Sequence, residues 1–159
     1  MISLTLTDVE YLRACAFGCA QHIASFGRVG RNQQATTIRG WQDSIEGAIG
    51  EFTLAKWLGI EYKGCIGFFR SRPDVGIYEV RATGHPYGRL LVRKHEDFDD
   101  TIYILVRQSR PPIVDIVGWM YGHECNRQDW WGALDKSRDP CYVVPNDMLH
   151  DMETLPEKC

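Results

Sequence analysis

The sequence predicts an α+β fold in which two N-terminal helices pack on a mixed, largely antiparallel central sheet. Residues 1–58 hold two long segments with apolar residues at helical spacing. Residues 64–122 form short runs rich in Val, Ile, Tyr and Phe, with turn-forming residues between them. The chain of 159 residues is 44% hydrophobic and 25% charged, which is typical of a single globular domain covering residues 1–159.

The first helix is expected over residues 7–27. Thr7 stands three residues before Glu10, the spacing of a capping box, and Gly27 ends the apolar periodicity. Three potential zinc ligands would share one face of this helix: Cys15, Cys19 and His22. The same face carries apolar residues that make packing in the core the stronger interpretation, namely Leu12, Ala16, Ile23 and Phe26.

A second helix is expected over residues 38–58, with Gly59 as its stop. At 100° per residue, Glu51 falls in the middle of a broad apolar arc of this helix. A lone ionised carboxylate on a buried face costs several kcal/mol, so Glu51 requires a cation, hydrogen-bond donors or a water-filled cleft. A buried ion pair with Arg81 or Arg93 is the structural alternative.

Short strands account for most of the remaining chain. Strand-like runs cover residues 64–71, 76–84, 89–94, 101–108 and 113–122. Residues 126–135 read as a short helix or an ordered loop, residues 141–145 as a last strand and residues 146–155 as a closing helical turn.

The stretch PDVGIYEVRATG, residues 73–84, places acidic and basic groups around the start of a strand. Asp74 lies in a tight turn, and alternation puts Glu79 and Arg81 on one face of the strand. The other face is expected in the core and carries Tyr78, Val80 and Ala82. We expect Glu79 and Arg81 to point into a cleft beneath the second helix, where Glu51 converges with Asp74 and Glu79. Such a set of oxygen ligands suits Mg²⁺ or Mn²⁺.

These residues resemble the PD-(D/E)XK nuclease superfamily, including its small phage-encoded members. The similarity covers about residues 45–107: the helix GAIGEFTLAKWLG, the turn PDVG, the tripeptide EVR and the strands RLLVR and TIYILV. It implies a restriction-endonuclease-like core in which Asp74 and Glu79 bind the metal and Glu51 assists from the helix. Arg81 takes the place of the motif lysine, so the implied catalytic set is Asp74, Glu79, Arg81 and Glu51.

Arginine at position 81 departs from the usual Glu-x-Lys pattern. Its guanidinium supplies charge and hydrogen bonds but cannot act as a base, because its pKa exceeds 12. The hydroxide would therefore come from metal-bound water. Lys94, near the end of the next strand, is an alternative source of a lysine for the same site.

The formal net charge of −3 and a pI near 5.9 argue against a general nucleic-acid coat protein. Contacts with nucleic acid would be local, and several arginines lie in expected loops: Arg28, Arg31, Arg39, Arg70 and Arg72. No run of residues is long and apolar enough for a membrane span, and the first residues lack the pattern of a secretory signal. These features favour a cytoplasmic protein without a membrane partner.

The sequence thus predicts a metal-dependent hydrolase that cleaves phosphodiester bonds of DNA, with RNA as an alternative substrate, encoded by a phage or a mobile element. The alternative is a catalytically inactive domain of the same fold that binds a nucleic acid or a host protein. Arg81 in place of lysine and the weakly acidic pI both favour this second interpretation.

Overall fold

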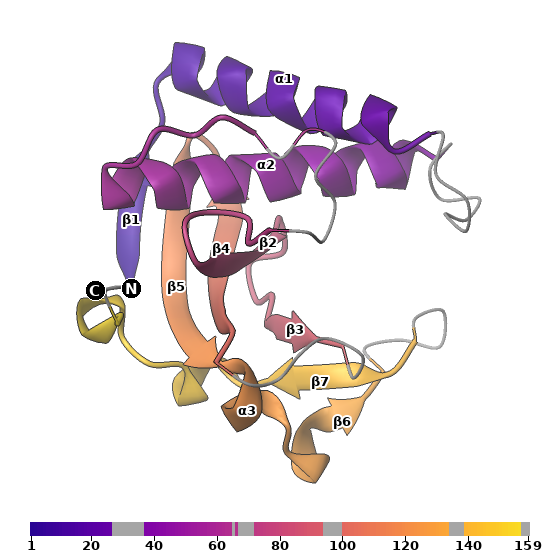
Figure 1. Ribbon diagram of the computed structural model, residues 1–159, viewed down its shortest axis with the longest axis vertical. Helices are drawn as coiled ribbons and strands as arrows, with labels where there is room; N and C mark the ends of the chain where they lie inside the picture. Colours follow the sequence, from indigo (N-terminus) through magenta and orange to yellow (C-terminus); the bar gives the residue numbers. More distant parts are fainter. Residues whose placement is uncertain (27–36, 65, 67–71, 94–99, 134–138, 157–159) are drawn as a thin grey trace.

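The computed structural model describes residues 1–26, 37–64, 66, 72–93, 100–133 and 139–156. It confirms the α+β fold, with a mixed four-stranded sheet and a second, antiparallel sheet of three strands. The two long helices, α1 (Asp8–Ala24) and α2 (Ile38–Leu58), precede most of the strands. Helix α2 lies along the larger sheet, α1 lies on the outer side of α2, and the smaller sheet lies at the other end of the molecule (Figure 1).

Helix α1 begins, and α2 begins and ends, where the sequence indicates, whereas α1 already ends at Ala24, before the expected stop at Gly27. The Thr7 hydroxyl accepts a hydrogen bond from the backbone N–H of Glu10, and the Glu10 carboxylate accepts one from the backbone N–H of Thr7. Thr37 caps α2 through Gly40, and Gly59 ends it in the left-handed region with φ of 69°. Because this conformation is costly for a residue with a Cβ, a glycine is the expected stop.

The four strands of the larger sheet are ordered β1 (Ile2–Thr5), β5 (Ile113–Tyr121), β4 (Ile102–Arg110) and β2 (Tyr78–Thr83). Strands β1 and β4 are antiparallel to β5, whereas β2 is parallel to β4. Strand β1 was not predicted, although Ile2 and Leu4 alternate with polar residues and pack against the core. Its four residues are too short a run to stand out before the capping box of α1.

The sequence predicts a single central sheet, but β3 (Leu90–Val92) leaves the larger sheet. It pairs with β7 (Cys141–Val144), which also pairs with β6 (Trp131–Gly132). The cause is the parallel pairing of β2 with β4, which requires the chain between them to cross over outside their sheet. Four short elements complete the fold: α3 (Gly122–Cys125), η2 (Gln128–Trp130), η3 (Asn146–Met148) and η4 (Met152–Thr154).

The larger sheet has an apolar core on each face. On the α2 side, Ile104 and Val106 of β4 pack with Val80 of β2 and with the apolar residues of α2. On the other side, Tyr103 and Leu105 of β4 pack against the smaller sheet. The alternation of β4 residues between the two cores explains why residues 102–106 of this strand are all apolar.

Helix α1 buries the opposite face from the one expected. Ala14, Gly18 and His22 are buried, and a Cβ on Gly18 would lie only 2.6 Å from the Cα of Ile45 in α2. His22 Nδ1 lies 2.9 Å from the Ser44 hydroxyl. The predicted core residues Leu12, Ala16, Ile23 and Phe26 are instead exposed, because α1 is the outermost layer and only its α2 side is covered.

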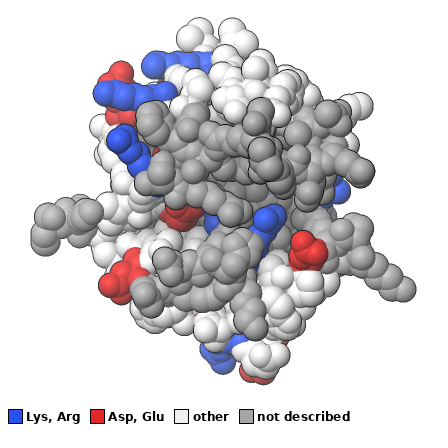
Figure 2. Space-filling view, turned by 45° about the vertical axis from the view of Figure 1, so that its right-hand side comes forward, with Lys and Arg blue, Asp and Glu red and all other residues white. Residues whose placement is uncertain are grey.

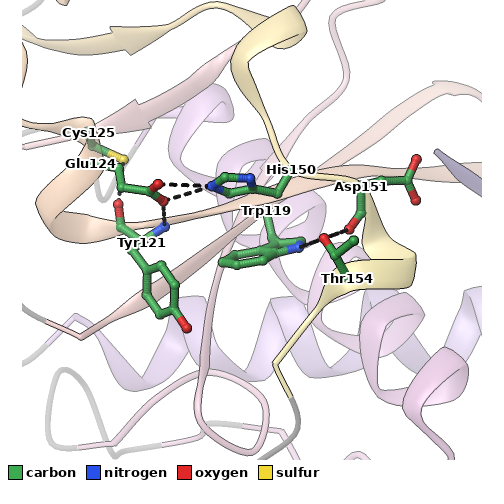
Figure 3. Close-up of polar contacts among 7 residues, drawn as sticks. All are labelled: Trp119, Tyr121, Glu124, Cys125, His150, Asp151 and Thr154. Atoms are coloured by element: carbon green, nitrogen blue, oxygen red, sulfur yellow. Dashed lines mark hydrogen bonds and ion pairs between the residues drawn. The ribbon is translucent and has the colours of Figure 1, made fainter.

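The C-terminal part of the described chain is fastened to β5. The indole N–H of Trp119 donates to the backbone carbonyl of Asp151 at 2.9 Å, and a backbone bridge joins Trp119 to His150. His150 Nε2 also lies 2.9 Å from a carboxylate oxygen of Glu124, while the backbone N–H of Tyr121 donates to that same oxygen (Figure 3). These contacts hold α3 and η4 on the end of the larger sheet.

None of the described helices is long and apolar enough to cross a membrane. The predicted strand over residues 64–71 lies almost wholly outside the described residues, as do Arg28, Arg31, Arg70 and Lys94.

Candidate functional site

Glu51 is buried in the middle of α2, where the helix is enclosed on all sides. Every residue from Ala48 to Ala55 is buried, and Glu51 is 8% exposed. Gly50 allows this close packing, because a Cβ there would lie 2.7 Å from the Cβ of Ala82 in β2. The sequence prediction that Glu51 sits on a buried face is confirmed.

Two uncharged donors hold the Glu51 carboxylate. The Tyr62 hydroxyl donates to Oε2 at 2.5 Å, and the Gln21 amide donates to the same oxygen at 3.3 Å. Tyr62 is itself buried and packs edge-on against Phe17 and Phe52. The suggested ion pair of Glu51 with Arg81 or Arg93 is not found among the described residues, so the carboxylate has hydrogen-bond donors but no cationic partner there.

The electrostatic surroundings of Glu51 favour its protonated form. Burial is the largest cause, followed by the charge of Asp74, and together with a smaller effect of Glu79 they raise the pKa of Glu51 from 4.5 to about 7. The hydrogen bonds from Tyr62 and Gln21 oppose this rise. The charges of Asp74 and Glu79 therefore both act on the Glu51 carboxyl group.

Asp74 lies in the tight turn that leads into β2. Reciprocal backbone hydrogen bonds between Val75 and Tyr78 close this turn, and Gly76 has a positive φ of 61°. The Asp74 carboxylate accepts a 2.8 Å hydrogen bond from the backbone N–H of Val80. This hydrogen bond provides an acceptor for a backbone N–H of β2, which is an edge strand of the larger sheet. Asp74 therefore has a structural role that the sequence did not suggest.

A pocket of about 170 Å³ lies beside these groups and is lined by Tyr62, Asp74 and Gly76 among others. It lies between the segment that follows α2 and the turn that leads into β2. The pocket therefore gives a small polar molecule or ion a place to approach Asp74 and the hydroxyl partner of Glu51.

Glu79 and Arg81 lie on the face of β2 that points away from α2. A Cβ on Gly50 of α2 would meet Val80 and Ala82, so the alternate residues face the other way. The Arg81 guanidinium lies 3.3 Å from the Glu79 carboxylate and 5.1 Å from the ring centre of Tyr103. The expectation that both side chains point into a cleft beneath the second helix was wrong.

No group of three or more His, Cys, Asp or Glu side chains in the described part of the chain is gathered for metal binding. Cys15, Cys19 and His22, the alternative zinc ligands, are likewise not gathered into such a group. The three acidic side chains Glu51, Asp74 and Glu79 offer only oxygen ligands, and their negative charge matches a hard divalent cation better than a neutral ligand. The assignment of Glu51, Asp74 and Glu79 to Mg²⁺ or Mn²⁺ stays a prediction.

Sequence reasoning missed Tyr62 and Gln21. Gln21 carries a weak signal, because it lies seven residues after the buried Ala14 on the side of α1 that faces α2. Tyr62 lies beyond the end of α2, and nothing in its spacing shows that the chain folds back to reach Glu51.

No protein-family model, curated protein or solved structure matches this chain.

Proposed function

We propose that this protein is a metal-dependent nuclease-like hydrolase that cleaves phosphodiester bonds of DNA, with Mg²⁺ or Mn²⁺ held by Glu51, Asp74 and Glu79. The observation that carries the proposal is the buried Glu51, whose pKa rises to about 7 beside two further carboxylates. A buried acidic group whose pKa is shifted by burial and by neighbouring charges is a common arrangement at catalytic sites. RNA is the alternative substrate, and a phage or a mobile element is the proposed origin of the protein.

A bound cation would supply Lewis-acid polarisation of the phosphate and a water of lowered pKa. The residues of this chain would each have a separate task. Tyr62 and Gln21 fix the orientation of the Glu51 carboxylate, and Asp74 joins the site to the edge of β2 through Val80. Since cation binding requires the ionised form of Glu51, we expect affinity to rise as the pH increases through about 7.

Arg81 is the residue proposed to stabilise negative charge on the reacting phosphate. Its side chain is 28% exposed, so a phosphate group could reach it while Glu79 still orients the guanidinium. Acidic and basic side chains are interspersed over the described part of the face in Figure 2. Contact with DNA would accordingly depend on a few arginines at the site and not on a broad basic surface.

A second candidate function is that of a catalytically inactive domain that binds a nucleic acid or a host protein. It is favoured by the position of Arg81, which contacts Glu79 and Tyr103 on the side of the sheet away from Glu51. In this case the acidic residues would serve stability and recognition alone.

Calorimetric titration with Mn²⁺ and Mg²⁺, together with cleavage assays on single- and double-stranded DNA and RNA, distinguishes the two candidates. Glu51→Gln and Glu79→Gln should each weaken Mn²⁺ binding tenfold or more, whereas the exposed Glu153→Gln should leave it unchanged. Metal binding with cleavage supports the hydrolase. Folded protein that binds Mn²⁺ but cuts no substrate supports the inactive domain, and protein that binds neither metal removes the metal site.

A further inference from the structure

The outward face of α1 is apolar, although no other described segment covers it. Three of the large apolar side chains on this face are strongly exposed: Val9 at 75%, Leu12 at 71% and Ile23 at 56%. A helix on the surface of a globular protein normally has charged residues on its solvent side. Asp8 and Arg13 are the charged residues of the exposed face, and both lie near its N-terminal end.

The spacing of these residues is that of a coiled coil. Together with Ala16 and the half-buried Cys19 they form a continuous 3-4-3-4 series, which we name the α1 seam: Val9, Leu12, Ala16, Cys19 and Ile23. In heptad terms Val9, Ala16 and Ile23 occupy a positions, and Leu12 and Cys19 occupy d positions. A narrow a and d seam of this kind fits a second helix and not a flat surface.

We propose that the α1 seam joins two copies of this chain through a parallel pair of α1 helices. Two features select this partner and orientation. Branched residues at a positions with leucine at d favour two-stranded parallel coiled coils, and Val9, Ile23 and Leu12 follow this rule. Asp8 and Arg13 occupy g and e positions five residues apart, so in a parallel pair Asp8 of each copy faces Arg13 of the other.

The length of α1 sets the strength of this contact. A helix of 17 residues is about 25 Å long, so the seam buries less than the roughly 800 Å² per partner of a standard interface. Its helices are already formed by packing against α2, which removes the ordering cost that an isolated peptide would pay. We therefore expect a dimer with a dissociation constant of roughly micromolar size.

Sedimentation equilibrium on the full chain tests the dimer and its interface. Wild type should show concentration-dependent dimers. Leu12→Glu should weaken dimerisation tenfold or more, and its circular dichroism spectrum should stay unchanged because Leu12 is exposed in the single chain. Met148→Glu, at an exposed apolar residue outside the seam, is the matched control and should dimerise like wild type. Wild type that stays monomeric, or Leu12→Glu that dimerises normally, overturns the proposal.

Cys19 reports the orientation of the pair. In a parallel pair the two Cys19 residues occupy facing d positions, so mild oxidation should join them, and peptide mapping should recover the Cys19–Cys19 disulfide. Cys19→Ser should abolish this link, whereas Cys15→Ser should retain it. If the oxidised dimer yields no peptide with a Cys19–Cys19 disulfide, the parallel arrangement is rejected. Monomeric wild type that sediments with vesicles of phosphatidylcholine and phosphatidylserine would assign the seam to a lipid surface instead.

Discussion

The hydroxyl of Tyr62 donates a 2.5 Å hydrogen bond to the buried carboxylate of Glu51. This bond stabilises the ionised form, and its loss should raise the pKa of Glu51 further. We expect Tyr62→Phe to cost about 1 to 3 kcal/mol of unfolding free energy at pH 8, because a buried acceptor loses its main donor. Urea unfolding measures the cost. Tyr142→Phe, which removes a buried hydroxyl bonded to the neutral Asn126, should leave the pKa of Glu51 unchanged.

Protein stability should fall as the pH rises through the range in which Glu51 ionises. Its pKa is about 7 in the folded chain and 4.5 in its ordinary range, so the folded state holds more protons than the unfolded state between these values. The stabilisation is complete below about pH 4.5 and is lost as the pH passes 7, with a total of roughly 3 kcal/mol. Unfolding curves from pH 5 to 8 measure it. Glu51→Gln should flatten this dependence, and an equally steep curve in that variant would assign it to another group.

Two substitutions at Asp74 separate its charge from its hydrogen bond. Asp74→Asn removes the charge but leaves an oxygen that can accept from the Val80 N–H, so the pKa of Glu51 should fall with little loss of stability. Asp74→Ala removes both and should also cost about 1 to 2 kcal/mol, since an edge amide of β2 loses its acceptor. Calorimetric unfolding together with carboxyl titration by infrared spectroscopy follows both quantities. Equal stability of the two variants would show that the hydrogen bond contributes nothing.

Arg81 should be dispensable for folding. It pairs with Glu79 where both side chains are about a quarter exposed, so Arg81→Ala should cost less than about 1 kcal/mol. Under the proposed hydrolase function, the same variant should lose most cleavage and keep its stabilisation by Mn²⁺, while Arg81→Lys should retain or increase activity. Melting curves with and without Mn²⁺, measured beside the cleavage assay, test this. A loss of several kcal/mol in Arg81→Ala would instead indicate a structural role.

Two glycines on the helices should respond in opposite ways to alanine. Gly18→Ala places a Cβ 2.6 Å from the Ile45 Cα and should destabilise the protein by about 1 to 3 kcal/mol by forcing α1 away from α2. Gly47→Ala meets no atom closer than 4.0 Å and should stabilise the protein by about 0.5 to 1 kcal/mol through helix propensity. Chemical denaturation of both variants gives the comparison. Stabilisation by Gly18→Ala would contradict the close contact of the two helices.

The sequence predicts the elements of this fold better than their arrangement. Capping residues act locally, which is why Thr7 marks the start of α1 and Gly59 the end of α2 correctly. The buried face of α1 depends on a partner far along the chain. Its apolar spacing points to the Leu12 side, but the small residue Gly18 permits the close approach that selects the other face.

The candidate site is predictable to the same limited degree. The position of Glu51 on a buried arc follows from helical geometry alone. Asp74 and Glu79 act on its pKa, but Glu79 lies on the face of β2 that points away from α2. Alternation along β2 correctly places Glu79 and Arg81 on the face opposite Val80, but it does not predict which of the two faces α2 covers. Tyr62 contacts Glu51 only because the chain turns back after Gly59, and the spacing of apolar residues does not predict such a turn.

The pairing of β1 with β5 has a consequence for synthesis on the ribosome. Ile2 pairs with Ile116, so β1 leaves the ribosome well before its partner β5 has been made. Helices α1 and α2, which are neighbours in sequence, can associate well before that point. A nascent chain that is stalled before residue 113 should therefore protect the helical pair from protease while leaving β1 open to cleavage, and protection of β1 should appear only after β5 has left the exit tunnel.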